Sequence, residues 1–290
     1  MKKIIILIPV FNDWNSLFKL LEKINFEILN LEYKFSIIII NDASTENVKQ
    51  TSLKFENISQ IKIINMNKNK GQSRCNAAGL KYIFEKEDFD YVILMDGDGE
   101  DKPEEIKLFI NKINHSSNLP IVGERIKRSE SLIFKICYAI HKILTYALTG
   151  KSIKFGHFTL LNRDIVQKLI NEKATWSNFS GSLTKISKRK IPIPSVRGKR
   201  YFDKSKMSYF NLILHSLSII SVFKITVLIR SLILIGIYIF FVYENVSFIT
   251  IIPIIFLIIL IISIFTISKR EDLNELNRSL ENINNIETIK

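Results

Sequence analysis

The sequence predicts an α/β fold, in which a mostly parallel sheet is covered by helices on both faces, followed by a hairpin of two transmembrane helices. Two observations predict this. In the first half of the chain, short apolar runs alternate with stretches whose apolar residues recur at helical spacing. Further along, residues 225–267 are almost wholly apolar. Their second part, 246–267, carries no charge and is long enough to cross a hydrocarbon core of about 30 Å.

The apolar runs of the first half predict strands, taken in order. The first run, in MKKIIILIPVF, ends at polar Asn12 and Asp13 without a small-residue cleavage site, which favours a buried strand over a signal peptide. Later runs at 35–40, 61–64 and 91–95 are each bounded by polar turn residues, and helical spacing occurs between them. In a parallel sheet of this kind, ligands bind at the carboxyl ends of the strands.

The apolar region divides into two predicted spans, 225–243 and 246–267, with a turn at Glu244 and Asn245. Arg230 lies near the start of the first span, where its long side chain can reach the headgroups. Lysine and arginine flank the hairpin on both sides and are missing from its tip, so the positive-inside rule predicts cytoplasmic ends. The alternative is a hairpin buried in a globular protein.

Three further segments have amphipathic spacing. Residues 131–148 and 207–223 predict helices that lie either on the membrane surface or in an ordinary core. After the hairpin, Leu273, Leu276 and Leu280 recur in a charged tail, which predicts a short self-association helix or a solvated amphipathic tail. The predicted units are a cytoplasmic domain over 1–206, a juxtamembrane helix over 207–223, a transmembrane hairpin over 224–268 and a cytoplasmic tail over 269–290.

The composition narrows the class of partner. Lysine and arginine number 41 and aspartate and glutamate 28 in 290 residues, for a net charge of +13. This excess indicates an anionic partner: nucleic acid, anionic lipid or a phosphorylated substrate. Nucleic acid ranks last because the sequence lacks a stripe of basic and aromatic residues. The two cysteines have no zinc-binding spacing and are expected to be free thiols in a reducing compartment.

An acidic turn follows the predicted strand at 91–95. Its carboxylates, Asp96, Asp98, Glu100 and Asp101, lie within six residues and repel one another unless a cation neutralises them. Oxygen ligands favour a hard ion such as Mg²⁺ or Mn²⁺. Since Mg²⁺ usually completes its coordination with water and phosphate oxygens, a phosphate-bearing substrate is expected. A calcium loop, or an acidic turn that caps the helix beginning at Pro103, is the alternative.

Polar residues also follow the other three predicted strands. The carboxyl ends of parallel strands share one edge of a sheet, so these residues are expected to converge beside the acidic turn. Asp42 is placed to accept hydrogen bonds from a base or ribose, although each residue taken singly could equally be a turn or cap residue. They are Pro9, Phe11, Asn12 and Asp13; Asn41, Asp42, Ala43 and Ser44; and Asn67, Gly71, Arg74 and Asn76.

Four segments resemble the successive motifs of family 2 glycosyltransferases, which have the GT-A fold and a DxD metal site. They are PVFND at 9–13, NDAST at 41–45, NKGQSRCNAAGL at 69–80 and MDGDGEDKPEEI at 95–106. The DxDxxxxPE form and the two-helix tail resemble the polyprenyl-phosphate glycosyltransferases, such as dolichol-phosphate mannose synthase. That group has an RxxGxSK element before the membrane segment. Here Arg200, Ser205 and Lys206 keep its register, with Asp203 where glycine is usual.

The resemblance implies roles for individual residues. The metal ligands are expected to be Asp96, Asp98 and Glu100. The nucleotide sugar is expected to contact Pro9, Phe11, Asn12, Asp13, Asp42, Gly71, Arg74 and Asp96. The acceptor phosphate is assigned to Arg128, Arg200, Ser205 and Lys206, and the catalytic residues are expected to be Asp98, Arg125, Arg128, Arg200 and Lys206.

The expected activity is an inverting, metal-dependent transfer of a sugar from a UDP- or GDP-linked donor to polyprenyl (undecaprenyl) phosphate at the cytoplasmic membrane. A lipid phosphate is already ionised at neutral pH and needs no catalytic base, only cations to hold it in line. The enzyme is expected to be a multi-pass protein of the inner membrane, and the leucine-spaced tail leaves room for a homo-oligomer. The alternatives are a glycosyltransferase for another lipid or glycan acceptor, or a non-catalytic membrane-tethered scaffold that binds nucleotide sugar.

Overall fold

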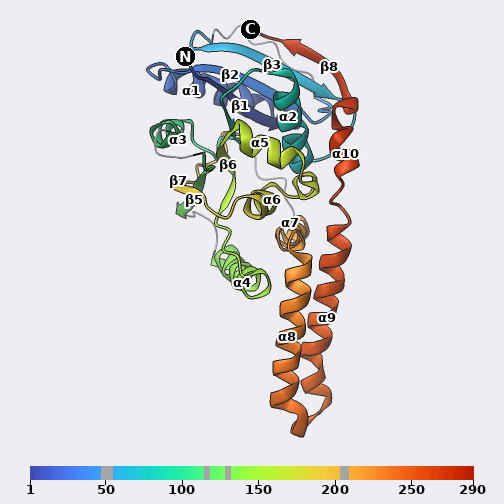
Figure 1. Ribbon diagram of the computed structural model, residues 1–290. Coiled ribbons are helices and arrows are strands. Elements are labelled where there is room, and N and C mark those ends of the chain that lie inside the picture. The colour runs from blue at the N-terminus through green and yellow to red at the C-terminus, as the bar shows by residue number, and fades with distance from the viewer. Residues whose placement is uncertain (47–54, 114–117, 128–131, 203–208) are drawn as a thin grey trace.

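The computed structural model describes residues 1–46, 55–113, 118–127, 132–202 and 209–290. Its centre is an eight-stranded sheet in the order β7-β5-β6-β4-β1-β2-β3-β8 (Figure 1). The strands are β1 (Lys3–Val10), β2 (Lys34–Asn41), β3 (Ile58–Met66), β4 (Tyr91–Leu94), β5 (Ile121–Lys127), β6 (Phe155–Asn162), β7 (Ile191–Val196) and β8 (Ile283–Thr288). Only β6 and β8 run against the others in the described sheet. The expected mostly parallel α/β fold is confirmed.

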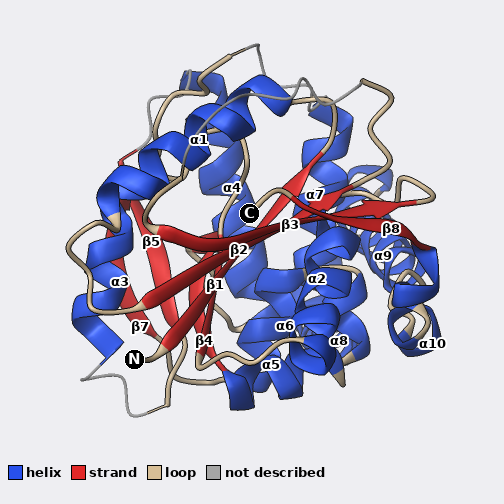
Figure 2. Ribbon diagram, turned by 90° about the horizontal axis from the view of Figure 1, so that it is seen from above, coloured by secondary structure: helices blue, strands red, loops and turns tan. Residues whose placement is uncertain are grey.

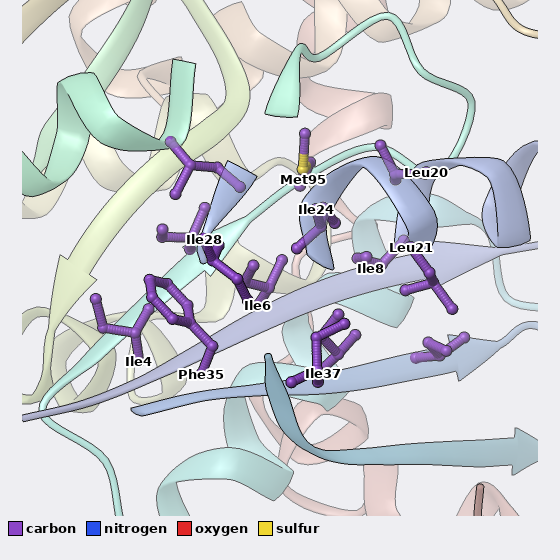
Figure 3. Packing of buried hydrophobic residues seen from close by; sticks show 14 of the residues in the cluster. Ile4, Ile6, Ile8, Leu20, Leu21, Ile24, Ile28, Phe35, Ile37 and Met95 are labelled. Carbon is purple, nitrogen blue, oxygen red and sulfur yellow. The ribbon is translucent and has the colours of Figure 1, made fainter. Parts of the chain in front are cut away.

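Helices cover both faces of the sheet (Figure 2). In β1, alternate side chains point to opposite faces, so Ile4, Ile6 and Ile8 pack under α1 (Trp14–Glu27) and α3 (Ile106–Ile113), as Figure 3 shows for the α1 side. Ile5 and Leu7 face α2 (Gln72–Lys86) and α5 (Arg163–Ile170). The remaining elements of the domain are η1 (Pro103–Glu105), η2 (Lys173–Trp176) and α6 (Phe179–Ile186).

A helical hairpin extends away from the sheet domain (Figure 1). It consists of α8 (Lys224–Val242), the turn η3 (Tyr243–Asn245) and α9 (Phe248–Ser268). Both helices are long and apolar enough to cross a membrane, and only 11% of the most apolar stretch of each is buried within the protein. A hairpin in a globular core would be mostly buried. The apolar surface of α8 and α9 is therefore the kind that a bilayer covers.

Two amphipathic helices lie where the hairpin meets the domain: α4 (Leu132–Thr149) and α7 (Tyr209–Ser221). Leu148 of α4 and Ile220 of α7 are buried against Val227 and Ile264 of the hairpin. The apolar side of α4 that carries Ile140, Ile143 and Tyr146 is exposed, with fractions of 60%, 70% and 62%. The apolar positions at 140 and 143 thus face outward instead of forming a core.

Arg230 contacts protein instead of standing free at the surface of α8. Its Nη1 donates to the carbonyl oxygens of Ala147 (3.1 Å) and Tyr146 (3.4 Å) at the end of α4. The last carbonyls of a helix have no partner within it, and a cation near them is favourable. Arg230 therefore links α4 to the hairpin.

The segment after the hairpin differs from the expectation of a solvated tail or a self-association helix. It forms α10 (Leu273–Asn277), η4 (Ser279–Asn282) and β8, and it returns to the sheet domain (Figure 1). Leu276 has no exposed surface and packs with Ala77 and Trp176, while β8 pairs antiparallel with β3. The leucine spacing did indicate an amphipathic helix, but its apolar side contacts this same chain.

Candidate active site

The loops after β1 and β2 are joined through Asn12. Its side-chain Oδ1 accepts the backbone N–H of Thr45 (2.8 Å) and of Glu46 (3.2 Å), and its own N–H donates to Ser44 Oγ (2.9 Å). Asn12 has a φ of +48°, a backbone conformation in which asparagine is enriched. The predicted convergence of these strand ends is present. Phe11, beside it, is 43% exposed and available to a ligand.

Asp42 holds the loop that leads into α2. Its two carboxylate oxygens accept the backbone N–H groups of Lys70 and Gly71, both at 2.8 Å, and the residue is only 3% exposed. Gly71 has a φ of +86° and open space around its Cα, so the backbone can approach a ligand closely there. In this arrangement Asp42 shapes the loop that carries Lys70 and leads to Arg74 in α2, and each of its oxygens already accepts one backbone N–H.

The acidic turn after β4 is largely buried and internally hydrogen-bonded. Asp101 Oδ2 accepts the backbone N–H of Asp96 (3.0 Å), and Asp98 Oδ1 accepts that of Glu100 (2.9 Å). Burial raises the pKa of Asp96 and of Asp101. Burial, followed by the neighbouring Asp96 charge, raises the pKa of Asp98 to about 6. Positive charge nearby favours the ionised forms of these carboxyls and so opposes the effect of burial.

Residues 197–201 supply that charge by lying directly on the turn. Arg200 donates from Nη1 to Asp98 Oδ2 and from Nη2 to Asp13 Oδ2, both at 2.7 Å, and Arg197 pairs with Glu100. The backbones also join, because the N–H of Gly198 donates to the carbonyl of Glu100 at 2.8 Å. We call residues 197–201 the arginine clamp.

Glycine is required where the clamp meets the turn. Gly99 has a φ of +85°, and a Cβ there would lie 2.5 Å from the ring of Tyr201. A Cβ on Gly198 would lie 2.8 Å from the carbonyl oxygen of Gly99. The two segments approach more closely than any side chain would allow.

The predicted metal ligands are only partly brought together. Among the described residues, no three acidic, histidine or cysteine side chains form a group that could hold an ion. Asp96 Oδ1 accepts Gln72 Nε2 (2.6 Å), while Asp98 and Glu100 face the clamp. The side chains of the turn nevertheless suit a hard cation, because they provide several largely buried carboxylate oxygens and Mg²⁺ needs only one or two carboxylates. The full three-carboxylate set is not assembled in this conformation.

A cavity of about 660 Å³ extends from Asp96 to α7 and to Arg270, which follows α9. Its cationic lining comes from Lys70 of the β3–α2 loop, Arg74 of α2 and Arg125 of β5. Leu212 of α7 and Arg270, two residues beyond α9, line it on the other side. Its wall combines cationic and apolar side chains. It is suited to a ligand that has an anionic group and an apolar chain.

Two largely buried histidines, His157 and His215, lie in the cavity wall. Burial, with the Arg125 charge, lowers the pKa of His157 to about 4, and burial, with His157 and Arg125, lowers that of His215 to about 4. His157 Nδ1 lies 3.7 Å from Asp96 Oδ1. Neutral imidazoles can donate or accept a hydrogen bond here without adding charge.

Some predicted site residues lie outside the described residues, and others were not predicted. Arg128, Ser205 and Lys206 fall in the first group, as does the unusual Asp203. Arg197, Gln72, His157 and Arg270 belong to the second. Gln72 stands within the motif at 69–80 but was given no role there, and the other three lie outside the four motifs. By contrast Pro9, Asp13, Gly71, Arg74, Arg125 and Arg200 all lie in or beside the cleft formed by the turn, the clamp and the cavity.

Comparison with known proteins identifies the family. The model of glycosyl transferase family 2 matches residues 5–170, which is more than half of the chain. Undecaprenyl-phosphate 4-deoxy-4-formamido-L-arabinose transferase of Klebsiella pneumoniae (strain 342) is 26% identical over 221 residues, which cover 73% of this chain and 64% of that protein. The protein of the same name from Salmonella choleraesuis (strain SC-B67) is 27% identical over 221 residues, with the same coverage. The chain thus matches less than two thirds of the length of these relatives.

Solved structures agree on the fold. Glucosyl-3-phosphoglycerate synthase from Mycobacterium tuberculosis, in complex with Mn²⁺, UDP-glucose and phosphoglyceric acid, superposes with a TM-score of 0.54 at 12% identity, covering 79% of each chain. S. aureus TarS 1–349 in complex with UDP-GlcNAc superposes with a TM-score of 0.51 at 14% identity, covering 80% of this chain and 70% of that one. The chain therefore belongs to glycosyl transferase family 2, and it has the GT-A-like fold that its motifs predicted.

Proposed function

We propose that this protein transfers a sugar from a nucleotide sugar to polyprenyl phosphate at the membrane surface, with inversion at the anomeric carbon. The observation that carries the proposal is the cavity, which joins the acidic turn at Asp96 to the end of the hairpin at Arg270. The cationic lining at Lys70 and Arg74 suits a diphosphate, and the apolar lining at Leu212 suits a lipid chain. The relatives named for transfer to undecaprenyl phosphate support this acceptor.

The donor is expected to bind at the strand ends. Phe11 and the loop organised by Asn12 and Asp42 are available to the nucleoside, and Arg74 and the glycine turn at Gly71 face its diphosphate. UDP- and GDP-linked sugars both fit this description. A divalent ion, Mg²⁺ or Mn²⁺, held by Asp96 and Asp98 would neutralise charge on the leaving diphosphate.

Reaction requires no base from the protein. An oxygen of the lipid phosphate forms the new bond to the anomeric carbon, while the bond from that carbon to the nucleoside diphosphate breaks and its electron pair leaves with the diphosphate. Attack opposite to the leaving group inverts the configuration. Arg125 lies in the cavity wall, where its guanidinium can hold the attacking phosphate, and Arg128, Ser205 and Lys206 remain predicted contacts of that phosphate.

Arg200 has a particular place in this scheme. It now spans Asp98 and Asp13, whose charges it neutralises. With a cation bound at Asp98, the Arg200 guanidinium would be available to a phosphate. Arg200 would then contact the substrates instead of the carboxylates. This would explain why an arginine predicted to bind the acceptor is paired with Asp13 and Asp98 here.

The membrane arrangement follows from the same elements. We propose that α8 and α9 span the cytoplasmic membrane, with the sheet domain in the cytoplasm, and that the exposed apolar face of α4 enters the headgroup region. Lys224, Lys269 and Arg270 at the domain end of the hairpin match the positive-inside rule. This location brings the cavity to the depth of a lipid phosphate.

The test is a donor screen with a matched pair of variants. Purified protein in lipid nanodiscs receives undecaprenyl phosphate, Mn²⁺ or Mg²⁺ and a panel of UDP- and GDP-sugars, and the readouts are released nucleoside diphosphate and lipid-linked sugar. Asp98→Asn should lower the rate by about 100-fold or more. Asp88→Asn is the control, because Asp88 is 82% exposed and pairs with Lys3 away from the turn.

Two results would contradict the proposal. Formation of no lipid-linked sugar with any donor would exclude this acceptor. The non-catalytic scaffold would be favoured if the donor screen shows no turnover and Asp98→Asn works as well as the wild type in cells.

A further inference from the structure

Glu275, in the segment after the hairpin, is joined to the wall of the cleft. Its Oε2 accepts the indole N–H of Trp176 at 2.9 Å and lies 3.8 Å from Lys70 Nζ. Glu275 itself does not line the cavity, whereas Trp176 and Lys70 both do. It is thus one step removed from any ligand bound there.

The backbone of Glu275 is held firmly. Its N–H donates to Asp272 Oδ1 at 2.9 Å, which caps α10, and the next residue, Leu276, is fully buried against Ala77 and Trp176. The carboxylate is therefore presented from a docked helix. Because β8 continues from this helix into the sheet, the whole segment fixes Glu275 relative to α2.

Trp176, which is held by Glu275, in turn contacts Arg74. The indole is only 3% exposed, and the Arg74 guanidinium lies over its ring, 5.5 Å from the centroid. A buried indole N–H needs an acceptor, and Glu275 provides it. The orientation of the ring, and of the arginine stacked on it, depends on that hydrogen bond.

Lys70, in the same cavity wall, contacts Glu275 directly. Its backbone N–H, with that of Gly71, is held by Asp42, and its side chain pairs with Glu275. One carboxylate on the post-hairpin segment thus meets both Lys70 directly and Arg74 through Trp176. Both are cationic side chains of the cavity wall, in the part proposed to bind the nucleotide sugar.

We infer that Glu275 is a positioning residue, which sets Lys70 and Arg74 for the diphosphate of the donor. The inference rests on the proposed function for the identity of that ligand. It assigns to the segment beyond the hairpin a part in the active site, although this segment lies outside the matched family region of 5–170.

The experiment uses full-length protein in nanodiscs, in a Trp14→Phe background so that Trp176 is the remaining tryptophan. One readout is acrylamide quenching of Trp176 fluorescence, which needs no ligand. The other is calorimetric affinity for inorganic pyrophosphate with Mn²⁺, which carries the diphosphate chemistry shared by UDP and GDP donors. Glu281→Gln is the control, because Glu281 is 63% exposed and pairs only locally with Arg278.

Glu275→Ala should increase the quenching of Trp176 and weaken pyrophosphate binding by about fivefold to tenfold, within the range for residues of one hydrogen-bonded network. Glu275→Gln keeps an oxygen for the indole, so quenching should return to the parent value. Pyrophosphate binding should still be weaker than in the parent, because Lys70 loses the ion pair that positions it, and this loss outweighs the removal of a carboxylate that repels the anion. It also serves if the alanine variant folds poorly. In a Trp176→Phe background, the effect of Glu275→Ala should be smaller, because the indole N–H is gone.

The inference is overturned if Glu275→Ala matches the parent in both readouts, or if Glu281→Gln weakens pyrophosphate binding equally. If the parent binds no pyrophosphate, the proposed function fails and the link to a diphosphate fails with it. The quenching comparison still tests the contact between Glu275 and Trp176 separately.

Discussion

Replacing Leu276 by alanine tests whether the segment after the hairpin is docked on the sheet domain. Leu276 has no exposed surface. Truncation of a buried leucine to alanine costs about 2–5 kcal/mol. Leu273→Ala is the matched control, since Leu273 is in the same helix, is 36% exposed and undergoes the same change in helix propensity. The control should cost about 1 kcal/mol or less.

The difference should appear as exchange of backbone amides in β8. Ile289, next to this strand, donates its N–H to Ile61 at 2.9 Å, and the strand stays paired only while α10 is docked. A loss of at least 2 kcal/mol corresponds to about a thirtyfold larger equilibrium constant for opening, and to a similar increase in the exchange rate, because 1.4 kcal/mol is a factor of ten. Hydrogen exchange followed by mass spectrometry of the peptide spanning 283–289 measures it. Equal exchange in both leucine variants would refute the docked arrangement.

Three further predictions concern other close contacts. Gly99→Ala should destabilise the fold by about 2–4 kcal/mol and lower the melting temperature, because Gly99 has a positive φ and a Cβ there would clash with the ring of Tyr201. Gly236→Ala is the control, since it has open space around it and should not lower the melting temperature. Equal melting temperatures of the two variants would contradict the close packing of clamp and turn. Arg230→Leu removes the donors to the last carbonyls of α4 and should speed amide exchange in that turn, so unchanged exchange would show that the contact is not formed. Burial raises the pKa of Cys75, so its thiol should resist iodoacetamide at pH 8 until the protein unfolds, and rapid native labelling found by peptide mapping would argue otherwise.

The strongest patterns of the sequence were the ones that predicted structure well. Uninterrupted apolar runs specify β1, β2, β4 and the two helices of the hairpin, since burial on both sheet faces or in a bilayer leaves little choice. The acidic turn was located because its charges cannot be left unpaired. Local patterns of this kind depend on neighbours in sequence.

What the sequence did not reveal depends on partners far along the chain. The strand β8 reads INNIET, with only two apolar residues, and it forms because the edge of β3 offers unpaired backbone groups more than 200 residues earlier. Arg197 lies outside the RxxGxSK register, and only the approach of residues 197–201 to the turn shows its pairing with Glu100. Asp42 was predicted to face a nucleoside, but its burial and two backbone partners could not be inferred from its position after a strand.

The pairing of β3 with β8 orders the events of biosynthesis. β3 leaves the ribosome early, whereas β8 emerges only after both helices of the hairpin have been made. Until then the outer margin of β3 is open, a surface prone to aggregation and to capture by chaperones. Closure of the sheet thus waits until the hairpin has been synthesised, and a chain that stalls before β8 emerges would present an incomplete sheet to the quality-control machinery of the cell.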